Sequence, residues 1–175
     1  MVRNISYVAL AVLMAVITAG CGQTTASNDS PQPVSVDKTQ YLLTEEPEGA
    51  VGVIMAREQA KDQDEIVLVG RIGGKKDPWF KDRAAFVMID ASMMLVADGS
   101  DAAAGEVCLD DCCASLLAGC TTLVKVVDEK GTVLPINAQS LLDADENDMI
   151  VVRGRVQRKD KDSFAVIANG VYVRR

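Results

Sequence analysis

The sequence predicts a mainly β protein with one small domain. Apolar runs of strand length recur between residues 65 and 175, and turn-forming Gly, Asp, Asn and Pro residues lie between them. Aromatic residues make up only 4% of the chain, so the core must be built from Val, Ile, Leu, Met and Ala. The five predicted strands are residues 66–72, 84–90, 121–127, 149–157 and 163–173.

The first and the fourth of these strands show two kinds of burial. The first, IVLVGRI, is almost entirely apolar and ends at Gly73-Gly74, which fits a buried strand that breaks at glycine. In the fourth, Val152 and Val156 alternate with Arg153 and Arg155. That alternation predicts one buried face and one exposed face.

Two helices complete the predicted domain. Apolar residues share one face over residues 48–60, and Thr44 could cap the N-terminus of a helix there. A short helical turn is expected over residues 138–142, between the third and the fourth strand. Asn169-Gly170 lies inside the fifth strand and predicts either a β-bulge or a hairpin turn.

Five strands with a short helix between the third and the fourth follow the order of an OB fold, a small Greek-key barrel. A different five- or six-stranded barrel, or a sandwich, is the alternative. Residues 132–156 contain TVLPIN, a leucine-bearing turn, an acidic stretch and MIVVRGRV, and they resemble bacterial periplasmic OB domains, including the haem chaperones of cytochrome c maturation. Those chaperones attach haem through a histidine, which this chain lacks, so the resemblance implies the fold and not the activity. Residues 41–175 are also similar to uncharacterised secreted proteins of planctomycete-type bacteria, which implies no activity.

The N-terminus has the pattern of a bacterial lipoprotein signal. Arg3 supplies a positive charge, an apolar run follows over residues 7–17, and small residues at 18–20 precede Cys21. This order resembles the lipobox, whose cysteine is lipidated and becomes the new N-terminus, although an aliphatic residue usually stands where this chain has Thr18. An ordinary secretory signal is the alternative, and it would leave Cys21 as a thiol.

This pattern predicts three parts of the chain. Residues 1–20 are expected to be a signal peptide, residues 21–40 a lipidated, flexible, polar tether, and residues 41–175 the barrel domain. The predicted location is the cell envelope, facing the periplasm or the exterior. Gly22 stands where an Asp often signals retention in the inner membrane, so the outer membrane is favoured where there is one.

Composition excludes several classes of function. The 175-residue chain has no histidine, which excludes Ser-His-Asp and Cys-His catalytic sets and His-ligated zinc or haem. Its formal net charge of −7 repels phosphate backbones, so nucleic-acid binding is not expected. No carboxylate pair, phosphate-binding loop or nucleophile–base set has suitable spacing. We therefore expect no catalytic residue and no cofactor.

Four cysteines lie in an insertion, residues 91–120, between the second and the third predicted strand. Cys108, Cys112, Cys113 and Cys120 form the pattern C-x3-C-C-x6-C. In an oxidising compartment, this pattern predicts two disulfides, in which Cys112 and Cys113 each pair with one of the outer cysteines. A zinc or copper site and a thiol–disulfide switch are the alternatives, but the paired C-x2-C spacing of structural zinc sites is absent, so no bound metal is expected.

Two sets of residues are candidates for a binding face. In OB folds ligands usually lie against the second and third strands. Trp79 and Phe80, in the preceding loop, could anchor a partner there or could instead plug the barrel. Arg153 and Arg155 could meet anionic groups or could simply form the exposed face of a strand. The sequence thus predicts a membrane-anchored, non-catalytic binding module for an envelope protein, a peptide or a glycan, with metal handling as the alternative function.

Overall fold

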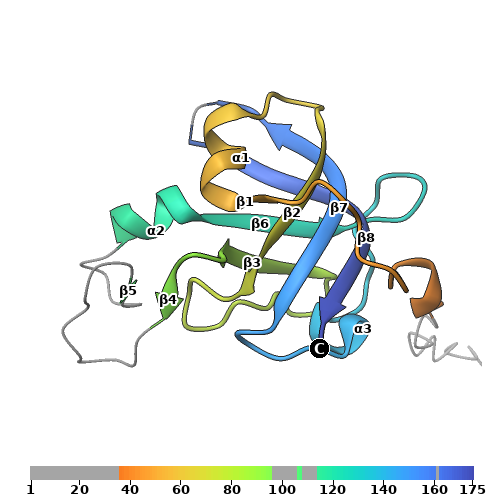
Figure 1. The fold of residues 1–175 in the computed structure, drawn as a ribbon. Coiled ribbons are helices and arrows are strands. Elements are labelled where there is room, and N and C mark those ends of the chain that lie inside the picture. The colour runs from red at the N-terminus through yellow and green to blue at the C-terminus, as the bar shows by residue number, and fades with distance from the viewer. Residues whose placement is uncertain (1–35, 96–105, 108–113, 161) are drawn as a thin grey trace, which may run out of the picture. The chain divides into compact units, whose positions relative to one another are not determined.

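The computed structural model describes residues 36–95, 106–107, 114–160 and 162–175 (Figure 1). The chain divides into two compact units, Met1–Gln32 and Pro33–Arg175. All the described residues belong to the second unit, which contains the predicted barrel.

Five strands close into a barrel: β2 (Glu65–Ile72), β3 (Ala85–Asp90), β6 (Thr121–Val126), β7 (Met149–Arg158) and β8 (Phe164–Arg174). Their spatial order is β2-β3-β6-β8-β7, and β7 pairs back onto β2. Neighbouring strands are antiparallel except β6 and β8, which are parallel. The short helix α3 (Ala138–Leu142) lies between β6 and β7 in the chain. These findings confirm the predicted mainly β, five-stranded OB-like barrel (Figure 1).

Shorter elements flank the barrel. The N-terminal part of the domain contains a 3-10 turn η1 (Lys38–Gln40), the two-residue strand β1 (Val51–Gly52) and the helix α1 (Val53–Gln59). Between β3 and β6 lie the paired strands β4 (Met94–Leu95) and β5 (Glu106–Val107) and the helix α2 (Ala114–Cys120).

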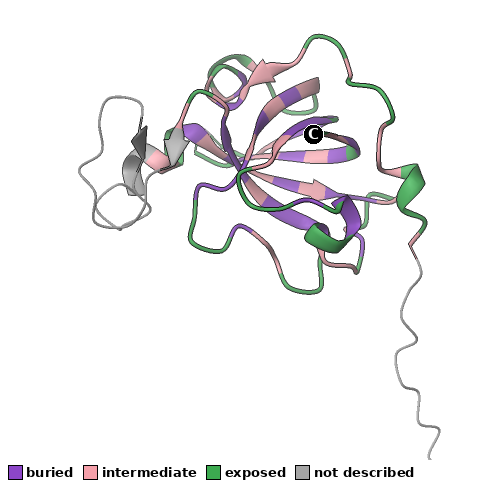
Figure 2. Ribbon diagram, turned by 60° about the horizontal axis from the view of Figure 1, so that its bottom comes forward, coloured by how far each residue is buried: buried purple, intermediate pink, exposed green. Residues whose placement is uncertain are grey.

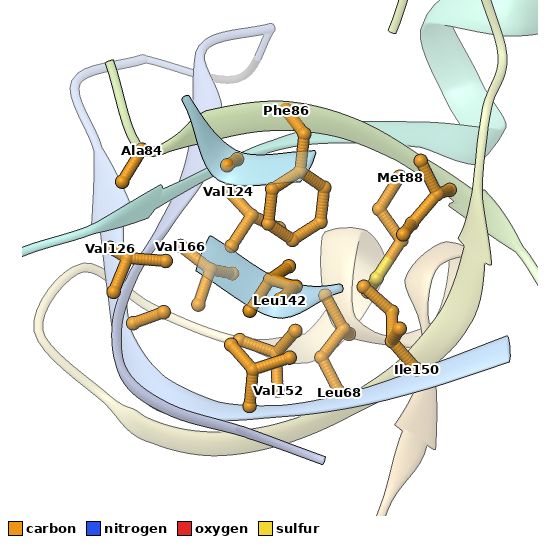
Figure 3. Close-up of a cluster of buried hydrophobic side chains, with 14 of the residues drawn as sticks. Leu68, Ala84, Phe86, Met88, Val124, Val126, Leu142, Ile150, Val152 and Val166 are labelled. Atoms are coloured by element: carbon orange, nitrogen blue, oxygen red, sulfur yellow. The ribbon is translucent and has the colours of Figure 1, made fainter. Parts of the chain in front are cut away.

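The barrel interior is filled by apolar side chains from the strands and from two helices. Leu142 of α3 lies among strand side chains, with Val152 and Leu68 on one side and Phe86 on the other (Figure 3). Val53 of α1 belongs to the same buried cluster. Figure 1 shows α1 and α3 at opposite ends of the barrel, and Figure 2 shows buried and less buried positions alternating along its strands.

The N-terminal helix is shorter than predicted. We expected residues 48–60, but α1 begins at Val53 because Val51 and Gly52 pair with β2 instead. A left-handed backbone at Gly49, with φ of 76°, also separates the start of the predicted range from the helix. Thr44 is therefore not the cap.

The cap of α1 comes from a distant strand. The Asp90 carboxylate, at the end of β3, accepts hydrogen bonds from the Ile54 backbone N–H at 2.9 Å and from the Ser92 hydroxyl at 2.6 Å. Burial alone would raise the pKa of Asp90, but bonds from Ser92 and from the Ile54 and Val53 backbone outweigh burial and lower the pKa below its ordinary value of 3.8. Asp90 thus ties α1 to the barrel as a carboxylate.

Residues 36–40, expected in the tether, lie against the barrel. Val36 packs on the buried cluster, and the Lys38 ammonium donates a hydrogen bond to the Ser140 carbonyl on α3. Just beyond them, the Leu43 N–H donates to the Val171 carbonyl at 2.9 Å. Contacts with the described part of the barrel therefore begin at Val36, ahead of the expected boundary at residue 41.

The fifth predicted strand contains a bulge and no hairpin turn. Arg153 of β7 pairs with Gly170, whereas the next residue, Gly154, pairs with Ala168. Asn169 is therefore the extra residue of a β-bulge in β8. A Cβ added to Gly154 would collide with the backbone carbonyl of Ile167, so β7 can approach β8 this closely only through a glycine.

We expect Gly154→Ala to lower the free energy of unfolding by about 1–3 kcal/mol, because the added methyl group meets backbone that cannot move aside cheaply. Urea unfolding followed by circular dichroism measures the change. Gly119→Ala is the matched control: its Cβ would meet nothing within 4 Å, and alanine favours the helix in which it lies. Equal stability of the two variants would contradict the close approach.

We expect Asp90→Asn to lower the free energy of unfolding by about 1–2 kcal/mol near neutral pH, because α1 loses a charged cap. The pKa of Asp90 is depressed in the folded state, so its contribution is complete above 3.8 and is lost as pH falls below that value. The difference between wild type and variant should therefore shrink in urea titrations on the acid side of 3.8.

Glu58→Gln is the control for this cap, since it removes an exposed carboxylate from the same helix. It should leave stability within about 0.5 kcal/mol of wild type. A difference between Asp90→Asn and wild type that stays constant down to the acid limit of folding would refute the charged cap.

Candidate functional site

An open groove of about 1090 Å³ lies on the outside of the barrel. Its floor and walls come from β2, β7, β8 and the turn that follows β6. Glu65, Arg153, Arg155, Gln157, Ile167 and Asn169 are among its lining residues. Both predicted arginines therefore lie in one hollow.

Strand pairing fixes the order of the side chains across this face. Arg155 pairs with Glu65 of β2 on one side and with Ile167 of β8 on the other, and Ile167 pairs in turn with Lys125 of β6. Residues paired directly across a sheet point to the same face. Lys125 also donates a hydrogen bond to Gln157 at 3.0 Å. A row of polar and charged side chains with Ile167 at its centre thus crosses the outer surface.

The bulge in β8 orients Arg153. The Arg153 Nε donates a hydrogen bond to the Asn169 side-chain oxygen at 3.2 Å. Asn169 is the residue that the bulge inserts into β8, so the bulge places the hydrogen-bond acceptor beside Arg153. This bond holds the Nε of an exposed side chain that lines the groove.

Three acidic residues, Glu65, Asp128 and Glu129, line the groove beside the two arginines. Glu65 lies 3.7 Å from Arg155, but the two side chains are 86% and 56% exposed, so solvent screens the pair. Asp128 is engaged in its own turn, where its carboxylate accepts hydrogen bonds from the backbone N–H groups of Lys130 and Thr132, each at 2.9 Å. The groove therefore keeps exposed guanidinium groups.

Another pair of arginines has a structural role. The guanidinium carbons of Arg57 and Arg158 lie 5.5 and 4.9 Å from the centre of the Phe164 ring. Arg57 donates to the backbone carbonyls of Thr121 and Asp162, each at 3.2 Å, and burial followed by the charge of Arg158 lowers its pKa. These side chains fasten α1 to the barrel.

Trp79 lies apart from the arginines. Its indole packs on the buried cluster and lies 6.0 Å from the Phe86 ring of β3, with 53° between the ring planes. This packing is the kind that the plug alternative predicts, and Trp79 is half-buried, so its role as a binding anchor stays a prediction. Phe80 is half-buried beneath the ammonium of Lys75 at 5.0 Å. Neither aromatic residue lines the groove, so the two predicted binding-face pairs do not form one site.

Only one of the predicted cysteines belongs to the part of the chain that the structure describes. Cys120 ends α2 with 3% of its surface exposed, and burial raises the pKa of its thiol. Cys21, Cys108, Cys112 and Cys113 lie outside the described residues, so lipidation and the two disulfides stay predictions. Among the residues that the structure does describe, no group of three or more His, Cys, Asp or Glu side chains is placed to hold a metal ion.

The sequence pattern predicts Arg153 and Arg155 as exposed candidates, but the prediction did not include Glu65, which lines the groove with them, or Lys125, which lies next to its lining. Lys125 alternates with buried Val124 and Val126, which marks it as outward-facing by the same pattern that identified the arginines. That signal could have been used. The proximity of Glu65, by contrast, depends on the pairing of β2 with β7 and has no local signal.

None of the helices in the described part of the chain has the length and apolar character needed to cross a bilayer. Comparison with known proteins finds no protein family and no curated protein that matches this chain.

Proposed function

We propose that this protein is a membrane-anchored, extracytoplasmic lipoprotein whose OB-like domain is a non-catalytic binding module for a protein, a peptide or a glycan of the cell envelope. The observation that carries the binding role is the groove of about 1090 Å³ in which Arg153 and Arg155 stay exposed. The observation that carries the anchor is the lipobox-like order before Cys21.

Binding takes place on the outer surface because the barrel interior is filled. Phe86, Leu142 and Val152 are fully buried at its centre and pack against one another (Figure 3). β7, the strand that carries both arginines, pairs with β2 on one side of them and with β8 on the other, which leaves their side chains as the means of recognition. The groove supplies these side chains from three strands.

The chemistry of the groove suits binding better than catalysis. Guanidinium and amide groups donate hydrogen bonds to anions but do not act as general bases near neutral pH. Of the three carboxylates that line the groove, that of Asp128 already accepts two backbone hydrogen bonds, and those of Glu65 and Glu129 are exposed to solvent, an environment that does not tune a general base. The groove is therefore assigned to ligand binding.

The predicted anchor limits where a partner can be met. Fifteen residue steps separate Cys21 from Val36, where the described domain begins. A fully extended chain of that length spans at most about 50 Å. The module would thus search for its partner within that distance of the membrane surface.

Cys21→Ser should move the protein from the membrane fraction to the soluble envelope fraction, because a chain without acyl groups has no stable anchor. Fractionation of cells followed by immunoblotting measures the shift, and metabolic labelling with an alkyne fatty acid should be lost together with it. Thr25→Ser is the matched control and should stay with the membrane. Membrane retention of Cys21→Ser would exclude lipid on this residue as the anchor.

Photo-crosslinking in living cells tests the binding role. A photoreactive residue at Glu65 or at Glu129, two exposed residues that line the groove, should give an adduct of the same mass. The same residue at Glu146, which is exposed but does not line the groove, should give none. Arg153→Gln with Arg155→Gln should abolish the adducts. Equal labelling from Glu146, or no labelling from either groove position, would contradict the proposed function.

A further inference from the structure

Arg153 and Arg155 repeat at the interval of an extended chain. They are outward-facing residues two positions apart on β7, so their Cα atoms lie roughly 6.6–6.8 Å from each other. A peptide in extended conformation presents every second side chain at the same interval. The Cα interval therefore matches that of alternate side chains in an extended peptide that runs alongside β7, while the Arg153 side chain contacts Asn169 of β8 and the Arg155 side chain contacts Glu65 of β2.

Both arginines are prepared for such a contact. Asn169 holds Arg153 through its Nε, which limits the conformational freedom that binding would otherwise remove. Arg155 is held only by the solvent-screened contact with Glu65 at 3.7 Å, which a ligand carboxylate can replace. Guanidinium and carboxylate groups pair through two parallel hydrogen bonds, so acidic groups suit this site.

The remaining groups of the groove favour a peptide over a sugar. Its lining residues include no aromatic side chain, so a sugar ring would have no flat surface on which to stack. Ile167, paired with Arg155, gives an apolar contact for an aliphatic side chain. Lys125 pairs with Ile167 outside the groove lining, and its ammonium donates a hydrogen bond to the groove residue Gln157 at 3.0 Å.

We infer that the groove recognises an extended peptide segment of a partner protein in which acidic residues alternate with neutral ones. Two carboxylates of the peptide pair with Arg153 and Arg155, and the chain between them lies over β7 and Ile167. Main-chain hydrogen bonds to β7 do not contribute, because β7 already pairs with β2 and β8. This inference rests on the proposed function and adds the chemistry and the spacing of the partner.

Fluorescence anisotropy with the full-length protein in neutral detergent tests the inference. The probe is a fluorescein-labelled peptide of five Glu-Thr repeats, and the first comparison is a peptide of five Gln-Thr repeats. We expect the acidic peptide to bind at least about tenfold tighter, because each arginine–carboxylate pair adds charge-assisted hydrogen bonds. A third peptide of the same composition, with its five Glu residues in one block, should bind several-fold more weakly than the alternating peptide.

Variants assign the binding to the groove. Arg153→Gln with Arg155→Gln should weaken the alternating peptide at least about tenfold. The matched control is Lys81→Gln with Lys159→Gln, which removes two charges from exposed residues that do not line the groove and should change affinity less than about threefold. Glu65→Gln should strengthen binding, since it removes the competing carboxylate.

Three results would overturn the inference. The block peptide could bind as tightly as the alternating one, the control variant could lose as much affinity as the arginine variant, or an oligogalacturonate could bind where the peptide does not. In each case photo-crosslinks from Glu65 and Glu129 would still support a binding module, so loss of this inference is distinguishable from loss of the proposed function.

Discussion

The structure depends on the way β2 closes the barrel. β2 pairs with β7 from Glu65 to Arg71 but with β3 only from Gly70 to Ile72. One edge of this strand is therefore paired along most of its length, whereas its other edge meets β3 only at the C-terminal end. Gly70 lies in the overlap, where it pairs with both neighbours and where a Cβ would collide with the carbonyl of Ile89. A closed barrel removes sheet edges. The pairing of β2 with both β7 and β3 therefore also encloses the interior in which the apolar side chains of all five strands are buried.

Two short stretches of strand edge, one on β2 and one on β8, are covered by the N-terminal part of the domain. β3 does not reach Leu68 of β2, and β1 pairs there instead. β6 ends its pairing with β8 at Ala168, and Tyr41 and Leu43 hydrogen-bond to Val171 beyond that point. Asp90 then holds α1 in place by capping it. The chain ahead of the barrel therefore completes the sheet and is more than a connection to the predicted anchor.

Local patterns predict the strands well because each strand buries a continuous or alternating apolar run. The predicted strand 66–72 and helix 138–142 match β2 and α3 to within one residue. The start of α1 was wrong because the pairing of Val51 and the Asp90 cap are contacts between distant residues. The candidate site divides in the same way. Alternation along β7 predicts that Arg153 is exposed. The groove around it depends on β2, whose Val67 pairs with Arg153 although it lies 86 residues earlier in the sequence.

Stability and the proposed recognition use opposite faces of β7. Its inward residues, Val152 and Val156, are fully buried, so their replacement by polar residues would destabilise the core. Its outward residues, Arg153 and Arg155, are exposed and do not belong to the buried cluster. The Asn169 bulge links the two faces: it interrupts the pairing of β7 with β8, and the Asn169 side chain accepts a hydrogen bond from Arg153. In the function that we propose, this interruption of the ladder contributes to binding because it orients an exposed arginine.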